Sequence, residues 1–407
     1  MKKIRIAIAL LVAVVFAQNV EAQAPNTTAK FGKGIRMLAA DSSFALNATF
    51  RFQTLFTTQG VLGESDWGTS MKIRRSRIKM NGWVYKPEFG YKVELALSNN
   101  DLKYGNDAAL NGGAPKIVLD AVFKWKPSKH FEFWAGQTKL PGNRERVISS
   151  QKLQFVDRTL VNSYFNIDRD LGIHFRGKMN TPVGIIKPIA AISMGEGRNI
   201  IANNVGGFNY TGRLEWLPMG SFTGKGDYFG SDLKREEKPK LSIGATYNFN
   251  DGSSKQKPAG SFLLDSVGNY LENDITTTTV DAIFKYKGFS VETEYTMVDC
   301  PDCGEEDLAD GETPSWVAAN GKTYNTGDGF TIQAGYLMKN NWEPALRYTQ
   351  IDSNNDYGFA GITEYTLGLS RYIVGHSLKF QSDVSYWEVE GSDDQFLRYR
   401  LQMEIQF

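Results

Sequence analysis

The chain of 407 residues has little cysteine, histidine and proline: two, three and 13 residues. Because only Cys300 and Cys303 are present, a scaffold of several disulfides is excluded, and a single local pair is the most that can form. A zinc site would need two further ligands, and neither a second cysteine pair nor a histidine cluster supplies them. We therefore predict no metal or other cofactor.

Long apolar runs are also missing beyond the N-terminus. No later segment approaches the run of about 18 apolar residues that indicates a membrane-spanning helix. An excess of charge is absent too, with 46 Lys+Arg against 45 Asp+Glu. A balanced chain offers no argument for nucleic acid as a partner, so any charge selectivity must come from local arrangement.

The N-terminus has the pattern of an export signal. Three basic residues among the first five precede an apolar stretch at 6–17, and small residues at Val20 and Ala22 suit cleavage before Gln23. The apolar stretch is short for a membrane span, although an uncleaved anchor is the alternative. We predict a signal peptide at 1–22 and a mature domain at 23–407 with 43 basic and 44 acidic residues.

The strongest pattern is an alternation with period two. From Leu397 to Phe407 every odd position is apolar and every even position is polar. This indicates a strand with one dry and one wet face. Its length matches the 9–11 or so residues that a tilted strand needs to cross a bilayer. A composition with 13% aromatic residues and 40 glycines also suits a barrel with a wet interior.

The same alternation recurs throughout the chain and predicts an all-β, 16-stranded antiparallel transmembrane β-barrel. The expected strands lie near 44–57, 71–85, 89–99, 116–126, 129–138, 169–179, 183–194, 207–217, 239–250, 278–287, 288–298, 327–338, 341–352, 361–373, 376–389 and 395–407.

The connections alternate between short periplasmic turns and long external loops, as a porin requires. Residues 218–238 are an exception, because a long segment stands where a short turn is expected. Either it forms an extra periplasmic hairpin or the strand count is wrong there. A soluble β-sandwich is the alternative fold, but its strands would be shorter.

Two segments resemble the phosphate-selective porin O and P family: 73–82 followed by 89–94, and 131–142 continuing through Glu145 and Asp157-Arg158. The C-terminal strand ending in Phe407 resembles the assembly signature of bacterial outer-membrane proteins. The resemblance implies a sixteen-stranded, trimeric channel whose third loop folds into the lumen. It also implies an outer-membrane location and assembly by the barrel-assembly machinery through the Phe407 strand.

A basic face lies on the strand predicted near 71–85. Arg75, Arg77 and Lys79 share the face opposite apolar residues, so they must face the lumen, because a charge in mid-bilayer lipid costs about 2–4 kcal/mol. Arg74 has the opposite parity, and we place it at the strand end near headgroups or a loop. A file of cations attracts anions. The alternative is that these charges pair with neighbouring carboxylates such as Glu94 or Asp120.

The expected third loop, 139–169, has a surplus of basic residues and would narrow the pore if it folds inward; the alternative is a loop on the rim with solvated charges. Arginine suits phosphate because its planar fork binds two oxygens. The predicted anion-binding, pore-lining residues are Arg75, Arg77, Lys79, Lys139, Arg144, Arg146, Lys152, Arg158 and Arg176.

An acidic stretch at 299–312 carries seven Asp and Glu and no basic residue. A solvated acidic loop is the preferred interpretation, with Ca²⁺ binding or a bridge to lipopolysaccharide as the alternative. Cys300 and Cys303 lie within it, and we predict a local disulfide formed during export.

We conclude from the sequence that the chain is an outer-membrane porin for passive diffusion of small hydrophilic solutes, with a preference for anions such as phosphate. Its expected partners are these anions, outer-membrane lipid or lipopolysaccharide, and copies of itself in a homotrimer. The alternative is a barrel without transport that acts as an adhesin or surface anchor. An enzyme is disfavoured, because His130 and His376 lie at predicted turns and His174 has no nucleophile near it in the pattern.

Overall fold

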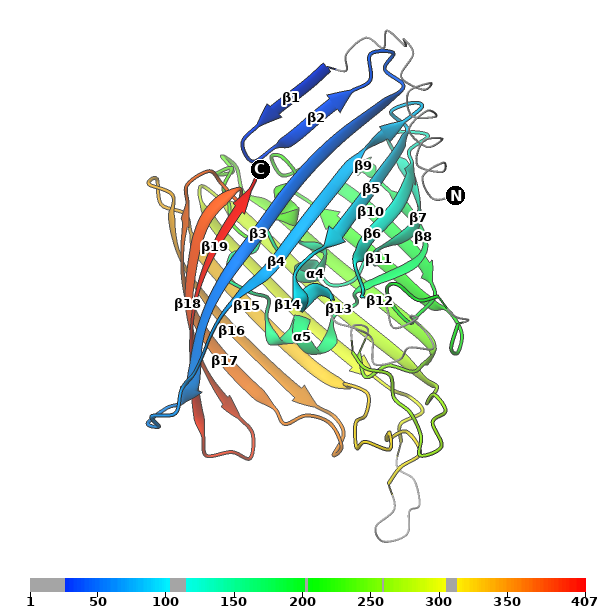
Figure 1. The fold of residues 1–407 in the computed structure, drawn as a ribbon, viewed down its shortest axis with the longest axis vertical. Helices are drawn as coiled ribbons and strands as arrows, with labels where there is room; N and C mark the ends of the chain where they lie inside the picture. The colour runs from blue at the N-terminus through cyan, green and yellow to red at the C-terminus, as the bar shows by residue number, and fades with distance from the viewer. Residues whose placement is uncertain (1–25, 103–114, 202–203, 258–259, 305–312) are drawn as a thin grey trace, which may run out of the picture.

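In a computed structural model, one antiparallel sheet closes on itself into a barrel (Figure 1). The structure describes residues 26–102, 115–201, 204–257, 260–304 and 313–407. The predicted signal peptide at 1–22 and most of the acidic stretch, 305–312, lie outside these residues. Among the residues that are described, no helix is long and apolar enough to cross a membrane.

Sixteen strands make the barrel wall: β3 (Phe44–Val61), β4 (Gly68–Val84), β5 (Phe89–Ala96), β6 (Val118–Trp125), β7 (Phe131–Lys139), β8 (Arg169–Gly177), β10 (Gly184–Ser193), β11 (Asn209–Leu217), β12 (Lys240–Ser253), β13 (Asn273–Tyr286), β14 (Phe289–Asp299), β15 (Gly327–Tyr336), β16 (Trp342–Ser353), β17 (Ile362–Tyr372), β18 (Leu378–Val389) and β19 (Gln395–Gln406).

The barrel closes where the last strand meets the first. Strand β19 pairs with β3, with Leu401 opposite Phe56. The backbones of Phe50 and Phe407 exchange two hydrogen bonds of 2.9 and 3.0 Å, and their rings lie 5.4 Å apart. Closure leaves no unpaired edge in the wall, as a sheet in lipid requires.

The predicted alternation is confirmed by the burial pattern. On β19, Leu401 is 44% exposed on the outer face, whereas Gln402 is 1% exposed on the inner face. On β14, the inward positions are the buried polar residues Ser290, Glu292 and Glu294. Apolar side chains thus face the lipid side and polar ones fill the lumen. The predicted fold class and the count of sixteen strands are confirmed.

Three further strands lie outside that count. A hairpin of β1 (Asn26–Lys30) and β2 (Gly34–Leu38) projects from the end of the barrel that carries the short turns (Figure 1). It continues the sheet through pairing of β2 with β3. Strand β9 (Met179–Thr181) prolongs β8 alongside β10. These strands are too short to show the long alternation used for the prediction.

The short turns use backbone shapes that their residues favour. Between β13 and β14, Lys287 and Gly288 have φ values of 49° and 93°. Two successive positive φ values are the mark of a type I′ turn, whose twist matches that of the flanking strands. Gly288 adopts this shape without the strain that a Cβ atom would bring.

The third loop, between β7 and β8, folds into the barrel as predicted. It carries α4 (Arg144–Val147) and α5 (Leu160–Phe165), and both lie within the ring of strands in Figure 1. The Thr159 side chain caps α5 by accepting a hydrogen bond from the Asn162 backbone N–H at 3.2 Å. A shorter helix, α2 (Asn99–Leu102), follows β5.

The long connection after β11 is neither an extra hairpin nor a sign of a miscount. Residues 218–239 include only a short 3₁₀ helix, η1 (Gly226–Tyr228), and the strand parity is kept across them. The segment turns inward: Ser231 and Asp232 are each 1% exposed. The path of this segment could not be predicted from the alternation within strands, because the path depends on contacts with side chains of distant strands.

At the opposite end, the loops after β12 and β14 form a small apolar cluster around Leu263, Trp316 and Tyr324. The predicted disulfide between Cys300 and Cys303 is present, and Cys300 is buried in this cluster. The disulfide closes a short turn at the start of the acidic stretch, and the packing of Cys300 in the cluster holds this turn against the loop after β12.

Candidate functional site

The basic face of β4 is interrupted by a β-bulge. Gln53 on β3 is opposite Arg75 while Thr54 is opposite Ile73, so Arg74 is the extra residue. A bulge re-aims side chains locally. Arg74 therefore turns to the lumen together with Arg75, which corrects the expectation that it would lie at the strand end near headgroups or a loop.

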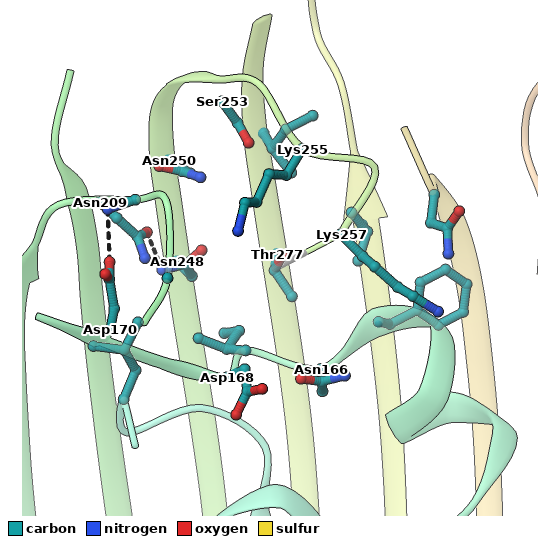
Figure 2. A pocket seen from close by; sticks show the side chains of 18 of the residues that line it. Asn166, Asp168, Asp170, Asn209, Asn248, Asn250, Ser253, Lys255, Lys257 and Thr277 are labelled. Atoms are coloured by element: carbon teal, nitrogen blue, oxygen red, sulfur yellow. Dashed lines mark hydrogen bonds between the residues drawn. The ribbon is translucent and has the colours of Figure 1, made fainter. Parts of the chain in front are cut away.

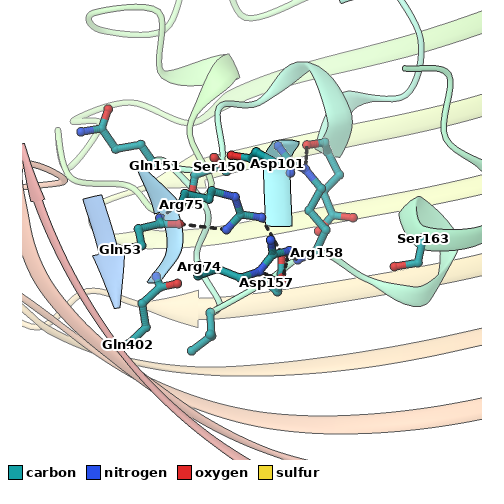
Figure 3. A network of polar contacts seen from close by, with 12 residues as sticks. Gln53, Arg74, Arg75, Asp101, Ser150, Gln151, Asp157, Arg158, Ser163 and Gln402 are labelled. Atoms are coloured by element: carbon teal, nitrogen blue, oxygen red, sulfur yellow. Dashed lines mark hydrogen bonds and ion pairs between the residues drawn. The ribbon is translucent and has the colours of Figure 1, made fainter. Parts of the chain in front are cut away.

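The two arginines of the bulge converge on one carboxylate of the third loop (Figure 3). Asp157 accepts from Arg74 at 2.7 Å and from Arg75 at 3.0 Å. The other side of the Arg75 guanidinium donates to the Gln53 amide oxygen at 2.9 Å. The third loop is thereby tied to the first two strands of the wall.

Further along the same wall, cations and carboxylates form pairs. Arg77 contacts Glu94 at 3.3 Å and Asp101 at 2.9 Å. Asp120 lies 2.8 Å from Lys92 and 3.2 Å from Arg169. The interpretation that wall charges pair with Glu94 and Asp120 thus holds for part of the basic face.

Other basic residues of this wall have no carboxylate partner among the described residues. Lys79, Lys124 and Arg176 make no ion pair within 4 Å there. Instead, Lys124 and Arg176 lie over the Trp134 ring, at 3.8 and 4.5 Å from its centroid. An aromatic face attracts a cation without neutralising its charge, so these two cations stay available to an anion.

The third loop is held by buried polar contacts of its own basic residues. Lys139 donates to the carbonyl oxygens of Arg146 and Ile148 at 2.5 and 3.1 Å. The Arg158 guanidinium donates to the carbonyl oxygens of Glu145 and Ile148 at 2.9 and 2.7 Å. These contacts stiffen the loop, and they join Lys139 and Arg158 to backbone carbonyl oxygens rather than to carboxylates.

Two cavities follow this wall, one on each side of the third loop. The outer chamber, on the side of the long loops, has a volume of about 540 Å³, and the described residues that line it include eleven basic and two acidic ones. The basic ones are Arg74, Arg75, Arg77, Lys116, Lys139, Arg146, Arg158, Arg169, Arg198, Lys255 and Lys257.

The inner chamber, on the side of the short turns, has a volume of about 220 Å³ and is lined by eight basic and two acidic residues. The basic ones are Arg51, Arg77, Lys79, Lys92, Lys124, Lys139, Arg169 and Arg176. Arg77, Lys139 and Arg169 line both chambers and mark the narrow junction between them.

A smaller side pocket opens beside the outer chamber (Figure 2). Lys255 reaches into it from the segment after β12, and Asn248 donates to Asn209 at 2.6 Å on its wall. Burial, followed by the charge of Lys116, lowers the pKa of Lys255 to about 8. Burial raises the pKa of Glu196, whose carbonyl oxygen accepts from Lys255, to about 7. Lys255, which lines the outer chamber, and its neighbour Glu196 thus both have a pKa near neutral pH.

Seven of the nine predicted residues line the chambers: Arg75, Arg77, Lys79, Lys139, Arg146, Arg158 and Arg176. The other two, Arg144 and Lys152, line neither chamber. Arg144 has no exposed surface and forms a 2.6 Å ion pair with Asp281 on β13. Lys152 lies with its ammonium 3.6 Å above the Phe229 ring. Their position within the third loop did not reveal which side of it they face.

The structure adds basic residues that the sequence argument did not select. Arg51, Lys92 and Lys124 have the lumen parity of their strands, and that signal could have found them. Three more come from loops, where polar and apolar residues do not alternate as they do in a strand: Lys116, Arg198 and Lys255. Only the three-dimensional path of those loops brings them to the outer chamber.

Comparison with known proteins agrees with this architecture. The sequence profile of phosphate-selective porin O and P matches residues 46–406. An uncharacterized protein of Aquifex aeolicus (strain VF5) is 24% identical over 368 residues, which cover 82% of this chain and 80% of that protein.

Solved structures show the same fold at low identity. The anion-selective porin of Comamonas acidovorans has a TM-score of 0.54 at 11% identity, covering 89% of this chain and 100% of that one. The outer membrane channel DcaP of Acinetobacter baumannii has a TM-score of 0.54 at 11% identity, covering 90% and 99%. OmpF of Salmonella typhi, in complex with daunomycin, has a TM-score of 0.55 at 11% identity, covering 90% and 98%.

The family and the fold are those of channel proteins. With a closed sixteen-stranded barrel, an inward third loop and a family match over most of its length, the chain belongs to the phosphate-selective porin O and P family and is an outer-membrane porin.

Proposed function

We propose that this porin passes small hydrophilic anions, phosphate among them, in preference to cations, and that it is not an enzyme. The observation that carries the proposal is the pair of chambers on one wall, in which basic residues outnumber acidic ones by eleven to two and by eight to two. A lumen lined by cations lowers the energy of a passing anion and raises that of a cation.

The inner chamber is the part of the path where selectivity is expected to be strongest. Lys79, Lys124 and Arg176 line it without a carboxylate partner among the described residues. At the junction, by contrast, the guanidinium groups of Arg77 and Arg169 are already paired with carboxylates. A guanidinium fork matches two oxygens of a phosphate, whereas chloride offers a single contact. We therefore expect phosphate to compete with chloride for the path.

The remaining parts of the proposal follow from the sequence. Residues 1–22 are removed during export, the strand ending in Phe407 engages the barrel-assembly machinery, the barrel sits in lipid with lipopolysaccharide outside, and the protein forms a homotrimer. The pairing of Phe407 with Phe50 supports a role of the C-terminal strand in closing the barrel.

The test is the reversal potential of purified protein in a planar bilayer under a KCl gradient, repeated with phosphate in place of chloride. We expect a clear anion preference that the Lys79→Gln, Lys124→Gln double variant reduces. Neither lysine has a carboxylate partner among the described residues, so neither replacement leaves a buried carboxylate unpaired there. A cation preference of the native protein would contradict the proposal, and absence of conductance would favour the adhesin.

The matched control is Lys126→Gln. Lys126 comes two residues after Lys124, just beyond the end of β6. It pairs with Glu132 near the surface and lines neither chamber. The loss of one positive charge at Lys126 should leave the reversal potential unchanged, whereas Lys124→Gln alone should already lower the anion preference.

A further inference from the structure

The lumen wall is divided into a basic half, β4 to β8, whose residues line the two chambers, and an acidic half, β13 to β17, whose residues line neither chamber. Five lumen-facing carboxylates of β13 to β17 are at most 6% exposed: Asp281, Glu292, Glu294, Glu343 and Glu364. The cations of the inner chamber on β4 to β8 include Lys79, which is exposed, and Lys92, Lys124 and Arg176, which are half-buried.

Part of the cover is the third loop, and part is the segment 218–239, which we call the inward segment. Its main attachment is Lys285 on β13, which is 1% exposed. The Lys285 ammonium donates to the carbonyl oxygens of Gly226, Phe229 and Ser231 at 2.9, 2.8 and 2.8 Å. All three hydrogens of this buried ammonium group thus form hydrogen bonds with the inward segment.

A second attachment reaches the far side of the acidic half. The Ser231 hydroxyl donates to Glu343 on β16 at 2.6 Å, and the Tyr372 hydroxyl donates to the same carboxylate at 2.7 Å. Asp232 accepts from the backbone N–H of Gly288 at 2.8 Å, in the turn between β13 and β14. The inward segment therefore lies across several strands of the wall.

The inward segment also joins the third loop. The Gly230 N–H donates to the Lys152 carbonyl oxygen at 2.9 Å, and Arg144 donates to the Asp227 carbonyl oxygen at 2.9 Å. On its other side, the Asp227 carboxylate lies 2.6 Å from Lys187 on β10. The two segments together form one layer over the acidic half at the end that carries the short turns.

We propose that the inward segment is a selectivity element: it closes the acidic half of the lumen at the periplasmic end and confines permeating ions to the basic chambers. Dissolved salt limits the reach of a charge to about 8 Å at physiological ionic strength, so a carboxylate acts on permeating ions only where the path comes close to it. Glu292, Glu294 and Glu343 have no cationic partner among the described residues, and they would attract cations if they were opened to the water-filled path. When these carboxylates are covered, the charges of the basic wall determine the electrostatic potential that a permeating ion meets. This inference rests on the proposed anion preference.

The decisive variant is a shortened protein in which residues 221–238 are replaced by Asn-Gly. With residues 218–220 and Pro239 kept, the connection between β11 and β12 then has six residues, close to the two to five of the other short connections. Opening the acidic half should raise the single-channel conductance roughly twofold, because a water-filled pore conducts in proportion to its open area. It should also shift the reversal potential toward zero under a KCl gradient. Unchanged conductance and unchanged preference would overturn the inference.

A thiol test on the full-length chain decides the same question if the shortened barrel does not assemble. The native cysteines are joined in a disulfide, so an introduced cysteine is the single free thiol. Thr49 on β3 lines the inner chamber, whereas Ile283 on β13 is fully buried in a cluster with Phe222 of the inward segment. With a charged methanethiosulfonate, Ile283→Cys should react about a hundredfold more slowly than Thr49→Cys, because a covered group reacts only after local opening. Equal rates would overturn the inference.

The outcomes separate this inference from the proposed function. A native protein that prefers cations contradicts the proposed function, whatever the shortened variant does. A native protein that prefers anions, together with a shortened variant that conducts and selects as the native one does, leaves the proposed function standing and rejects the role of residues 218–239.

Discussion

Arg75 and Asp157 form a 3.0 Å ion pair that joins a wall strand to the third loop, and Arg74 binds the other oxygen of the same carboxylate at 2.7 Å. One acidic residue thus partly neutralises two cations of the outer chamber and anchors the loop that narrows the path. In a variant that lacks this carboxylate, the two roles can be measured separately.

Asp157→Asn should increase the anion preference. The substitution leaves Arg74 and Arg75 without a carboxylate, so the outer chamber gains effective positive charge. The lost ion pairs should weaken attachment of the loop by about 3 kcal/mol, which would appear as more frequent current fluctuations. Reversal potential and single-channel noise measure the two effects. Asp265→Asn, in the loop after β12 and outside both chambers, is the control, and a lower anion preference of Asp157→Asn would contradict the expectation.

Arg144→Met should destabilise the barrel without a direct effect on selectivity. Arg144 is fully buried and donates to Asp281, Ser242 and the Asp227 carbonyl oxygen, so three contacts are lost at once. We expect a loss of about 3 kcal/mol, because Asp281 keeps its 2.6 Å pair with Arg213. The measurement is the temperature at which the folded band converts to the unfolded one on a denaturing gel.

Arg146→Met is the comparison for Arg144, because it lies on the same short helix but lines the outer chamber. It should lower the anion preference and cost less stability. If Arg144→Met changed selectivity as strongly as Arg146→Met while the melting temperature stayed native, the assignment of Arg144 as an anchor would be wrong.

The anion preference should decline as the pH rises from about 6 to about 9. Lys255, whose pKa is lowered by burial to about 8, is charged below that value and neutral above it. Glu196, whose pKa is raised by burial to about 7, gains its negative charge over the same range. Both changes make the outer chamber less positive.

The Lys255→Arg variant should remove the upper part of this pH dependence, since a guanidinium stays charged throughout the range. Reversal potentials recorded at a series of pH values measure the effect. A native preference that stays constant over the range would show that neither group acts on the path.

The Cys300→Ser, Cys303→Ser double variant should loosen the external loops and leave the barrel intact. The disulfide lies in the apolar cluster of Leu263, Trp316 and Tyr324, away from the chambers. Faster cleavage of the loops by protease on intact cells is expected, with an unchanged melting temperature of the barrel. Loss of barrel assembly would show instead that the disulfide guides folding.

Much of the fold could be predicted because a bilayer imposes a local rule. A barrel strand that crosses lipid must place apolar and polar side chains at alternate positions. The residues from Leu397 to Phe407 therefore show by themselves which side chains face the lipid and which face the lumen. The same rule located Arg75, Arg77 and Lys79 in the lumen. The position of β4 within the wall followed from counting strands in order.

The candidate site was predicted less completely, because loops follow no period. The bulge at Arg74 changes the parity that the strand pattern assumed. Arg144 and Arg158 lie in the same loop, yet one is buried against Asp281 and the other lines the outer chamber. The side of the loop that Arg144 faces depends on Asp281, which is 137 residues away in the chain.

The sequence by itself determined the closed barrel and the sign of the charge on its first strands, because both follow from alternation within single strands. Only the tertiary structure decided where the path runs. The third loop and residues 218–239 meet through Gly230 and Lys152. Together they cover the acidic half of the lumen wall, whereas the two chambers lie along the basic half. Such a division arises from contacts between segments distant in the chain, and no local pattern encodes it.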